Sequence, residues 1–146
     1  MIILNQDARM SSAEIGRQLG LTERTVRNRI NKLIDEGIVR LVAVVNPLYF
    51  GYDLVADIYC EVEVPQREAV IHALSQMPEV SYIAVSTGDQ DISVQALFKN
   101  STDMHDFITT RLYSVPGIRR TKTVLVPHIV KDTHQWIPPI EDFSIE

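Results

Sequence analysis

Apolar residues recur at helical spacing in two neighbouring stretches near the start of the chain. Ile15 and Leu19 lie four residues apart, which places them one turn apart on the same helix face. Val26, Ile30 and Leu33 recur in the same way further along. The two stretches therefore predict two amphipathic helices, each with one buried face.

The connection between these helices has the residues that a tight turn requires. Gly20 suits a left-handed turn position, Leu21 is an apolar residue that can fill the space beneath the turn, and Thr22 is a good N-cap for the next helix. Gly16 is a small residue within the first helix, and Gly37 fits the end of the second. With the buried valine of the second helix, this order predicts a helix-turn-helix, whose second helix enters the DNA major groove.

The face of the second helix opposite its buried positions is polar and basic. Arginine can fork onto guanine and asparagine onto adenine, whereas lysine and threonine suit phosphate. Glu23 is the only acidic residue between Thr22 and Ile34, and an ordinary surface helix contains more acids. A solvated charged face is the plainer interpretation, but the adjoining turn favours DNA contact. The predicted DNA-binding residues are Thr22, Arg24, Thr25, Arg27, Asn28, Arg29 and Lys32.

The pattern changes after the second helix. Residues 38–45, IVRLVAVV, form a β-branched run that predicts a short strand or wing, and Asn46-Pro47 interrupts it. We therefore predict a winged helix-turn-helix DNA-binding domain over residues 1–45, followed by a linker with apolar anchors over residues 46–53.

From residue 54 onward the pattern predicts the order strand, helix, strand, strand, helix, strand. Strands are expected where apolar and polar residues alternate, and helices where apolar residues recur every three or four positions. The predicted strands span residues 54–64, 80–87, 92–98 and 118–126, with a turn at Gly88-Asp89-Gln90. The predicted helices lie around residues 70–77 and 104–112, the second capped by Ser101 or Thr102.

Each predicted helix of this half leads through a proline into a strand, at Met77-Pro78 and at Val115-Pro116. Two such halves make a ferredoxin-like sheet with both helices on one face. The predicted fold class is α+β: a winged helix-turn-helix domain joined to a ferredoxin-like βαββαβ domain of the RAM type over residues 54–146. We expect Tyr59 and the Ile83/Val85 side on the uncovered sheet face, which would pair with a second chain.

Charge is distributed unevenly along the 146 residues. The formal net charge is −5, which argues against a general nucleic-acid coat protein. Residues 1–40 contain seven basic and five acidic residues, a net charge of +2, whereas the remainder contains seven and fourteen, a net charge of −7. The basic residues thus gather on the predicted DNA-reading domain.

Composition narrows the class of protein further. Cys60 is the only cysteine, so no intramolecular disulfide is possible, and a reducing cytoplasm is expected. No apolar run is long enough to span a bilayer, and we expect no secretory signal and no membrane partner. The four histidines lack zinc-like spacing, and neither a phosphate loop nor a nucleophile elbow is present. We predict no catalytic residue, no metal, no cofactor and no enzymatic activity.

Nearly the whole chain resembles the Lrp/AsnC family of feast/famine transcriptional regulators. The resemblance rests on ILNQDARMSSAEIGRQLGLTERTVRNRINKLIDEGIV (residues 3–39), Asn46-Pro47, STGDQD (86–91), and LYSVPGI (112–118) leading into Thr121-Lys122-Thr123. It implies a DNA-binding domain, a ligand-sensing ferredoxin-like domain, amino acid effectors, and dimers that often assemble into octamers. The family's first helix usually begins several residues earlier, so either the true start lies upstream of Met1 or this helix is short.

The resemblance also implies an effector site at residues 86–91, near an interface between dimers. A free amino acid needs an acceptor for its ammonium and N–H donors for its carboxylate; Asp89 and Asp91 offer the first, and the backbone around Gly88 offers the second. A plain hairpin turn is the simpler interpretation of Gly88-Asp89. Asp89 and Asp91 could also be interpreted as a pair of metal ligands, but two carboxylates without further ligands are weak evidence for a metal site. Thr121 and Thr123 share one strand face. The predicted effector-binding residues are Ser86, Thr87, Gly88, Asp89, Asp91, Thr121 and Thr123.

The predicted function is that of a sequence-specific DNA-binding transcriptional regulator modulated by an amino acid effector, with promoter DNA and a homodimer, or octamer, as partners. Two alternatives remain open. Siroheme decarboxylase subunits look similar overall, but a tetrapyrrole needs histidine or arginine in a cavity, and the basic recognition helix argues against that activity. A ligand-binding module with a vestigial helix-turn-helix would show no salt-dependent DNA affinity.

Overall fold

The computed structural model describes residues 1–139 of the chain. It divides into two compact units: residues 1–44 together with the segment from Lys131, and residues 45–130. The sequence prediction had assigned the segment from Lys131 to the second domain. Among the described helices, none has the length and apolar character needed to cross a membrane.

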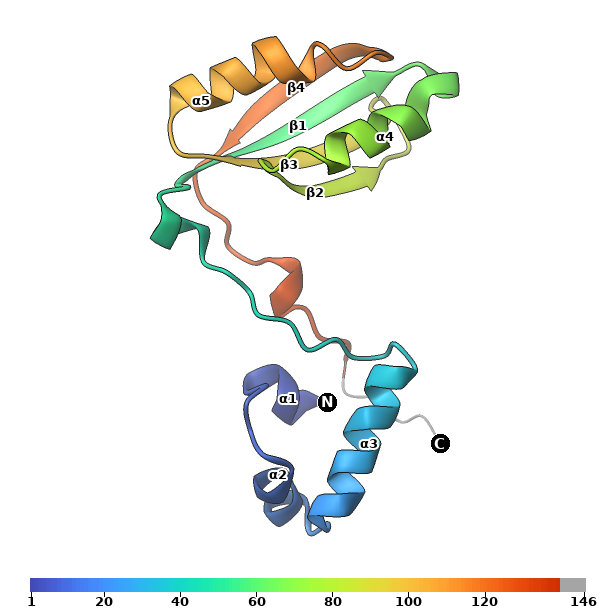
Figure 1. The fold of residues 1–146 in the computed structure, drawn as a ribbon, viewed down its shortest axis with the longest axis vertical. Coiled ribbons are helices and arrows are strands. Elements are labelled where there is room, and N and C mark those ends of the chain that lie inside the picture. Colours follow the sequence, from blue (N-terminus) through green and yellow to red (C-terminus); the bar gives the residue numbers. More distant parts are fainter. Residues whose placement is uncertain (140–146) are drawn as a thin grey trace. The chain divides into compact units, whose positions relative to one another are not determined.

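Three helices build the first unit: α1 (Ile2–Gln6), α2 (Ser12–Leu19) and α3 (Glu23–Asp35) (Figure 1). Each contributes one side chain to a small buried core, Leu4 from α1, Ile15 from α2 and Val26 from α3. The two helices predicted from the apolar spacing are confirmed, and the buried face of α3 is the one that the spacing indicated. In α2 only Ile15 of the predicted apolar pair is buried, whereas Leu19 at the end of the helix is 55% exposed.

A capping box fixes the start of α2. The Ser11 hydroxyl oxygen accepts a hydrogen bond from the Glu14 N–H (3.2 Å), and the Glu14 carboxylate accepts one from the Ser11 N–H (3.0 Å). The Ser11 hydroxyl donates to the same carboxylate, and this bond is the main reason that the pKa of Glu14 lies below its ordinary value. These hydrogen bonds thus determine the residue at which α2 begins.

Close packing at Gly16 sets the angle of the helix-turn-helix. A Cβ at this position would lie 2.6 Å from the Leu21 carbonyl oxygen, and the Leu21 N–H donates to the Gly16 carbonyl (2.9 Å). Gly20 ends α2 with φ of 66°, a left-handed conformation that disfavours other residues. Both glycines are therefore required by geometry, as their spacing indicated.

Residues 38–45 follow α3 as an extended segment without strand structure. The predicted strand is absent because a strand needs a partner, and no described residue pairs with the backbone of residues 40–45. Leu41, Val42, Val44 and Val45 are all exposed, with Val45 at 63%. A short 3-10 turn, η1 (Pro47–Phe50), comes next, and Asn46 caps it.

The second unit has the predicted βαββαβ order (Figure 1). Its elements are β1 (Leu54–Val62), η2 (Val64–Gln66), α4 (Arg67–Ser75), β2 (Val80–Val85), β3 (Ile92–Phe98), α5 (Ser101–Asp106), the π-helical continuation η3 (Phe107–Leu112) and β4 (Ile118–Val126). A short turn, η4 (Thr133–Gln135), follows in the segment that belongs to the first unit.

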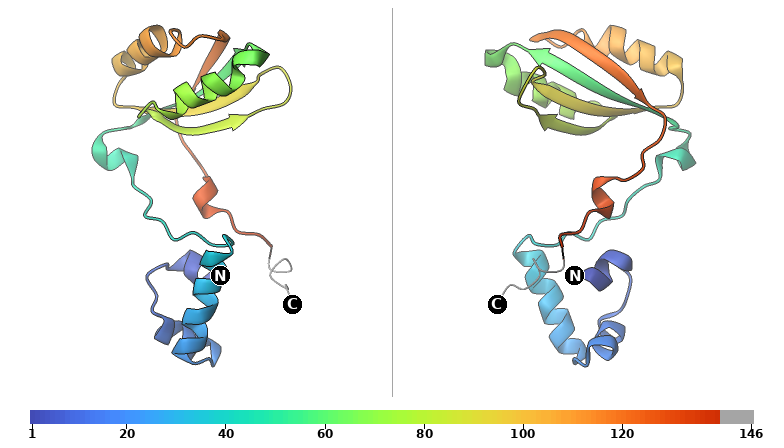
Figure 2. Two further views of the ribbon diagram at one scale, coloured as in Figure 1. Left: turned by 45° about the vertical axis from the view of Figure 1, so that its right-hand side comes forward. Right: turned by 180° about the vertical axis from the view of Figure 1, so that it is seen from behind.

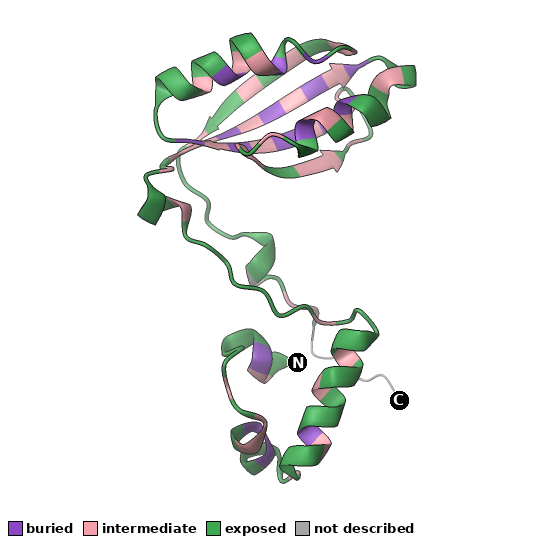
Figure 3. Ribbon diagram, viewed as in Figure 1, coloured by how far each residue is buried: buried purple, intermediate pink, exposed green. Residues whose placement is uncertain are grey.

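The four strands form one antiparallel sheet in the order β2-β3-β1-β4, which is the ferredoxin-like arrangement. Both helices cover the same face of the sheet, and the view from behind shows the other face open (Figure 2). Buried and half-buried residues alternate along β1 and β3 (Figure 3). The buried set includes Ile58 and Cys60, and burial raises the pKa of the Cys60 thiol to about 11.

Two details differ from the sequence prediction. Asn100, rather than Ser101 or Thr102, caps α5, because its side chain accepts from the Asp103 N–H (2.8 Å). Ile83 and Val85 lie on the helix-covered side of the sheet by register, since they pair with the buried Val94 and Ile92, and Ile83 packs against the core. An irregularity in the pairing between Val80 and Tyr82 determines which side chains of β2 face the helices. Tyr82 therefore lies on the open face, where it pairs with Gln95.

Candidate functional site

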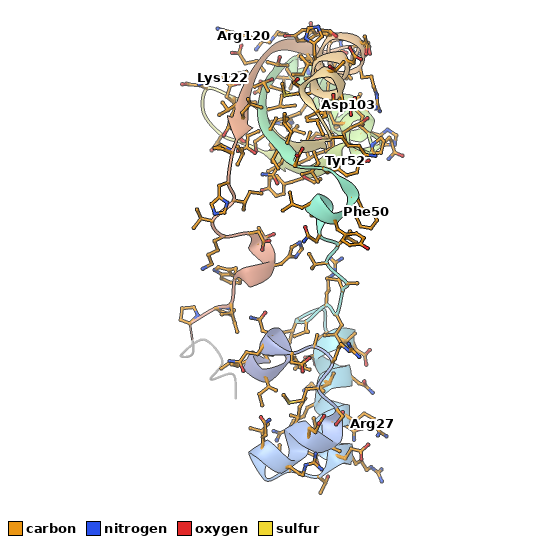
Figure 4. The ribbon with its side chains drawn as sticks, turned by 90° about the vertical axis from the view of Figure 1, so that its left-hand side faces the viewer. Arg27, Phe50, Tyr52, Asp103, Arg120 and Lys122 are labelled. Carbon is orange, nitrogen blue, oxygen red and sulfur yellow. The ribbon has the colours of Figure 1, made fainter. Side chains whose placement is uncertain are left out.

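The exposed face of α3 presents basic and amide side chains. Arg24, Arg27, Asn28, Arg29 and Lys32 are all exposed. Arg27 pairs with Glu23, and Lys32 lies 3.7 Å from Glu36 along the helix. Neither Arg24 nor Arg29 has an ion-pair partner among the described residues. These two guanidinium groups are available to a phosphate or a base edge, and Arg27 projects from the side of the helix (Figure 4).

Two of the predicted DNA-binding residues also hold the start of α3. The Thr22 hydroxyl accepts from the Thr25 N–H (3.2 Å) and shares a further hydrogen bond with the Thr25 hydroxyl (2.8 Å). Thr25 is half-buried, whereas Thr22 is exposed. The pair therefore orders the first turn of α3, which positions Arg24 between them.

Residues 86–91, hereafter the 86–91 turn, connect β2 to β3 at one end of the sheet. The Ser86 N–H donates to the Asp91 carbonyl (2.8 Å), which closes the base of the turn. Gly88 has φ of 130°, and a Cβ there would meet no atom within 4 Å. The requirement for glycine is thus conformational. The N–H groups of residues 87–90 make no hydrogen bond to any described residue.

The two acidic residues of the 86–91 turn differ in their surroundings. Asp89 is exposed, and no hydrogen bond or ion pair joins its side chain to the described residues. Asp91 is half-buried, and its carboxylate accepts the Val62 N–H (2.8 Å). The two carboxylates that the sequence treats as equivalent are therefore distinct, because one already has a partner in the protein.

Thr121 and Thr123 lie on the same face of β4, as their spacing predicts. They pair with Cys60 and Ile58 of β1, so both point to the helix-covered side. Thr121 and Ile92 flank Cys60 on opposite sides, which brings Thr121 to the same end of the sheet as the 86–91 turn. Within the described chain no hydrogen bond joins either threonine to that turn.

Tyr113 is a neighbour of this region that the sequence pattern did not single out. The Thr121 hydroxyl donates to the Tyr113 hydroxyl oxygen (3.4 Å), and Tyr113 is 59% exposed. Tyr113 belongs to the connection between η3 and β4, a segment that the sequence identifies only through its resemblance to the family. An exposed aromatic after a helix gives no signal of its own in a single sequence.

The open face of the sheet has both polar and apolar side chains; at one end Val55 of β1 pairs with Leu97 of β3 and Val126 of β4. By register it contains Tyr59 of β1 and Lys122 of β4, which pair directly, and Glu61, which lies 4.0 Å from Arg120. Arg120 and Lys122 project from β4 in Figure 4. The Gln95 amide donates to the Asp57 carboxylate (3.1 Å) on the same face. The polar and charged side chains thus lie toward the end of the face that is nearer the 86–91 turn.

A helix-turn-helix with an exposed basic helix, joined to a ferredoxin-like domain with an open turn, defines a two-domain, ligand-responsive DNA-binding protein. The Lrp/AsnC ligand binding domain matches residues 57–136, and a winged helix-turn-helix DNA-binding domain matches residues 1–40. The chain belongs to the Lrp/AsnC family of HTH-type transcriptional regulators. The resemblance seen in the sequence is confirmed.

Individual relatives agree with this assignment. An HTH-type transcriptional regulator of Pyrococcus abyssi is 35% identical over 88% of this chain and 82% of the relative. Two solved structures share the fold. A Neisseria meningitidis regulator in complex with L-Met has a TM-score of 0.88 at 24% identity and covers 97% of this chain and 92% of its own. A Mycobacterium tuberculosis feast or famine regulatory protein complexed with L-methionine has a TM-score of 0.83 at 21% identity, with coverages of 94% and 93%.

Proposed function

We propose that this regulator reads promoter DNA with α3 and responds to a free amino acid bound at the 86–91 turn. The observation that carries the first half is the exposed basic face of α3. Arg24 and Asn28 have the side chains that read guanine and adenine, and Lys32 suits a phosphate contact. Thr22, Thr25, Arg27 and Arg29 complete the proposed DNA surface.

The unpaired groups of the 86–91 turn support the second half of the proposal. The free N–H groups of residues 87–90 suit an α-carboxylate, and the free carboxylate of Asp89 suits an ammonium. Asp89 is a better ammonium acceptor than Asp91, because the Asp91 carboxylate already accepts the Val62 N–H. Ser86, Thr87, Gly88, Thr121 and Thr123 complete the proposed effector site.

L-methionine is the first effector to test, because the two structural neighbours described above were solved with it. Coupling between effector and DNA is reciprocal: an effector that weakens DNA binding is itself bound more weakly by the DNA complex. We further propose that the protein acts in the cytoplasm and without catalysis, as a lone buried Cys60 and the basic helix support.

Two surfaces support a homodimer, which in this family often assembles further into an octamer. Residues 40–45 present exposed apolar side chains and backbone groups that make no hydrogen bond to a described residue, and a second copy of the same segment can pair with them. The open sheet face offers opposite charges in Glu61 and Arg120 to a two-fold related copy. A dimer also provides two recognition helices for two half-sites.

Substitution on α3 tests DNA reading. Arg24→Ala and Asn28→Ala are expected to cost about 1–3 kcal/mol each on the specific site and to relax base preference at one position. Lys32→Ala should weaken binding on all sequences and lower the salt slope by about one unit. Fluorescence titration of operator and scrambled DNA at several salt concentrations measures both effects.

Arg119→Ala is the matched control, because Arg119 is an exposed arginine of the other unit. If Arg24→Ala and Asn28→Ala footprint the promoter like the wild type, the base contacts lie elsewhere. A wild-type protein without any salt-dependent DNA affinity would contradict DNA reading altogether and support the vestigial helix-turn-helix.

Calorimetric titration with L-methionine tests the effector site. Asp89→Asn removes the charge that receives the ammonium, and we expect it to weaken binding by about 2 kcal/mol or more if the pair is desolvated. Glu68→Gln, an exposed acid at the start of α4, is the control and should bind like the wild type. Equal affinities for Asp89→Asn and wild type would move the site elsewhere.

A further inference from the structure

Asp91 has three separate hydrogen bonds, one within the 86–91 turn and two to β1. Its carbonyl accepts the Ser86 N–H (2.8 Å) across the base of the 86–91 turn. Its N–H donates to the Cys60 carbonyl (3.0 Å), and its carboxylate accepts the Val62 N–H (2.8 Å). One residue therefore closes the turn and ties it to the backbone of Cys60 and Val62, two buried residues of β1.

The carboxylate of Asp91 replaces a main-chain acceptor. The pairing of β1 with β3 ends at Cys60 and Ile92, so beyond that pair Val62 has no β3 carbonyl for its N–H. A bulge between Glu61 and Val62 interrupts the register on the β4 side at the same point. The side chain of Asp91 reaches across this gap and continues the ladder by one bond.

We infer that Asp91 is a positioning residue for the effector: its carboxylate latches the 86–91 turn to the end of β1 at Val62, so that the turn has its binding conformation before the ligand arrives. This inference rests on the effector site proposed above. It assigns Asp91 a role distinct from Asp89, which would contact the ligand itself. A preorganised turn binds more tightly because ordering it costs nothing at the moment of binding.

The latch reaches a rigid part of the domain. Immediately after Val62, the Glu63 N–H donates in the opposite direction, to the Gly117 carbonyl (2.8 Å). Gly117 has φ of 94°, and a Cβ there would lie 2.7 Å from the Gln66 Cβ, so its place is fixed closely. The end of β1 to which Asp91 binds is thus held from the β4 side as well.

Amide hydrogen exchange of the ligand-free protein tests the latch directly. In Asp91→Ala the Val62 and Ser86 amides should exchange about 10–100-fold faster, because a hydrogen bond to a charged acceptor is lost and the turn is released. Asp91→Asn retains an acceptor oxygen and should keep most of the protection. Asp89→Asn should leave both amides at the wild-type rate, and unchanged exchange at Val94 would show that the sheet remains folded. Wild-type rates at Val62 in Asp91→Ala would overturn the latch.

Titration with L-methionine separates positioning from direct contact. Positioning predicts about tenfold or greater loss of affinity in Asp91→Ala and recovery of most of it in Asp91→Asn. Direct contact with the ammonium predicts that Asp91→Asn binds as poorly as Asp91→Ala while its amides stay protected, and this result would overturn the inference. If the wild type gives no heat with L-methionine or any of the other standard amino acids, the proposed effector site fails, whereas the exchange rates still decide whether the latch exists.

Discussion

Single residues decide how tightly the helix-turn-helix folds, and Gly16 is the clearest example. Its backbone lies so close to the Leu21 carbonyl that an added methyl group would stand 2.6 Å from the oxygen. The neighbouring atom is backbone, so relief requires a shift of the turn itself. Gly20 has open space around it, and its constraint is the positive φ alone.

Gly16→Ala should therefore destabilise the first unit by about 1–3 kcal/mol, the usual cost of overpacking. Gly20→Ala should cost about 1 kcal/mol through backbone strain without a clash. Thermal unfolding followed by circular dichroism measures both, with DNA affinity falling in parallel for Gly16→Ala. An unfolding midpoint of Gly16→Ala equal to that of the wild type would show that the turn opens easily and that this contact is unimportant.

At the scale of elements, the sequence predicted most helices and strands because apolar periodicity reports the buried face directly. The helix-turn-helix, the strand order and the turn at Gly88 follow from local patterns. Residues 38–45 did not form the predicted strand, because β-branched composition indicates a propensity, whereas a strand requires a neighbour. The cap at Asn100 was missed because Ser101 and Thr102 are equally good caps by residue type.

The candidate site was predictable as a place but not as a set of roles. The STGDQD motif located the 86–91 turn, and residue types indicated acceptors and donors. The hydrogen bond from Val62 to Asp91 could not be predicted, because it joins two elements at the point where the pairing of β1 with β3 ends. Tyr113 was overlooked for a similar reason, because its contact with Thr121 joins two elements.

At the scale of the whole molecule, the proposed dimer can be tested by measuring the mass of the protein in solution. Light scattering at micromolar concentration should give a mass of at least two chains, because the apolar segment of residues 40–45 gains a partner by self-association. Replacing Val42 and Val44 with lysine should lower the mass, since charges on an edge oppose pairing. Arg17→Lys, an exposed change on α2, is the control. A monomer mass for the wild type would contradict the dimer and the octamer together.

The exposed segment of residues 40–45, whose backbone pairs with no described residue, has a consequence for the lifetime of the protein in the cell. In the proposed dimer these exposed apolar side chains gain a partner, so a single newly made chain would leave them accessible to proteases and chaperones. When an obligate dimer forms, its stability depends on protomer concentration. The abundance of such a regulator would therefore have a lower threshold, below which single chains are cleared faster than they can find one another.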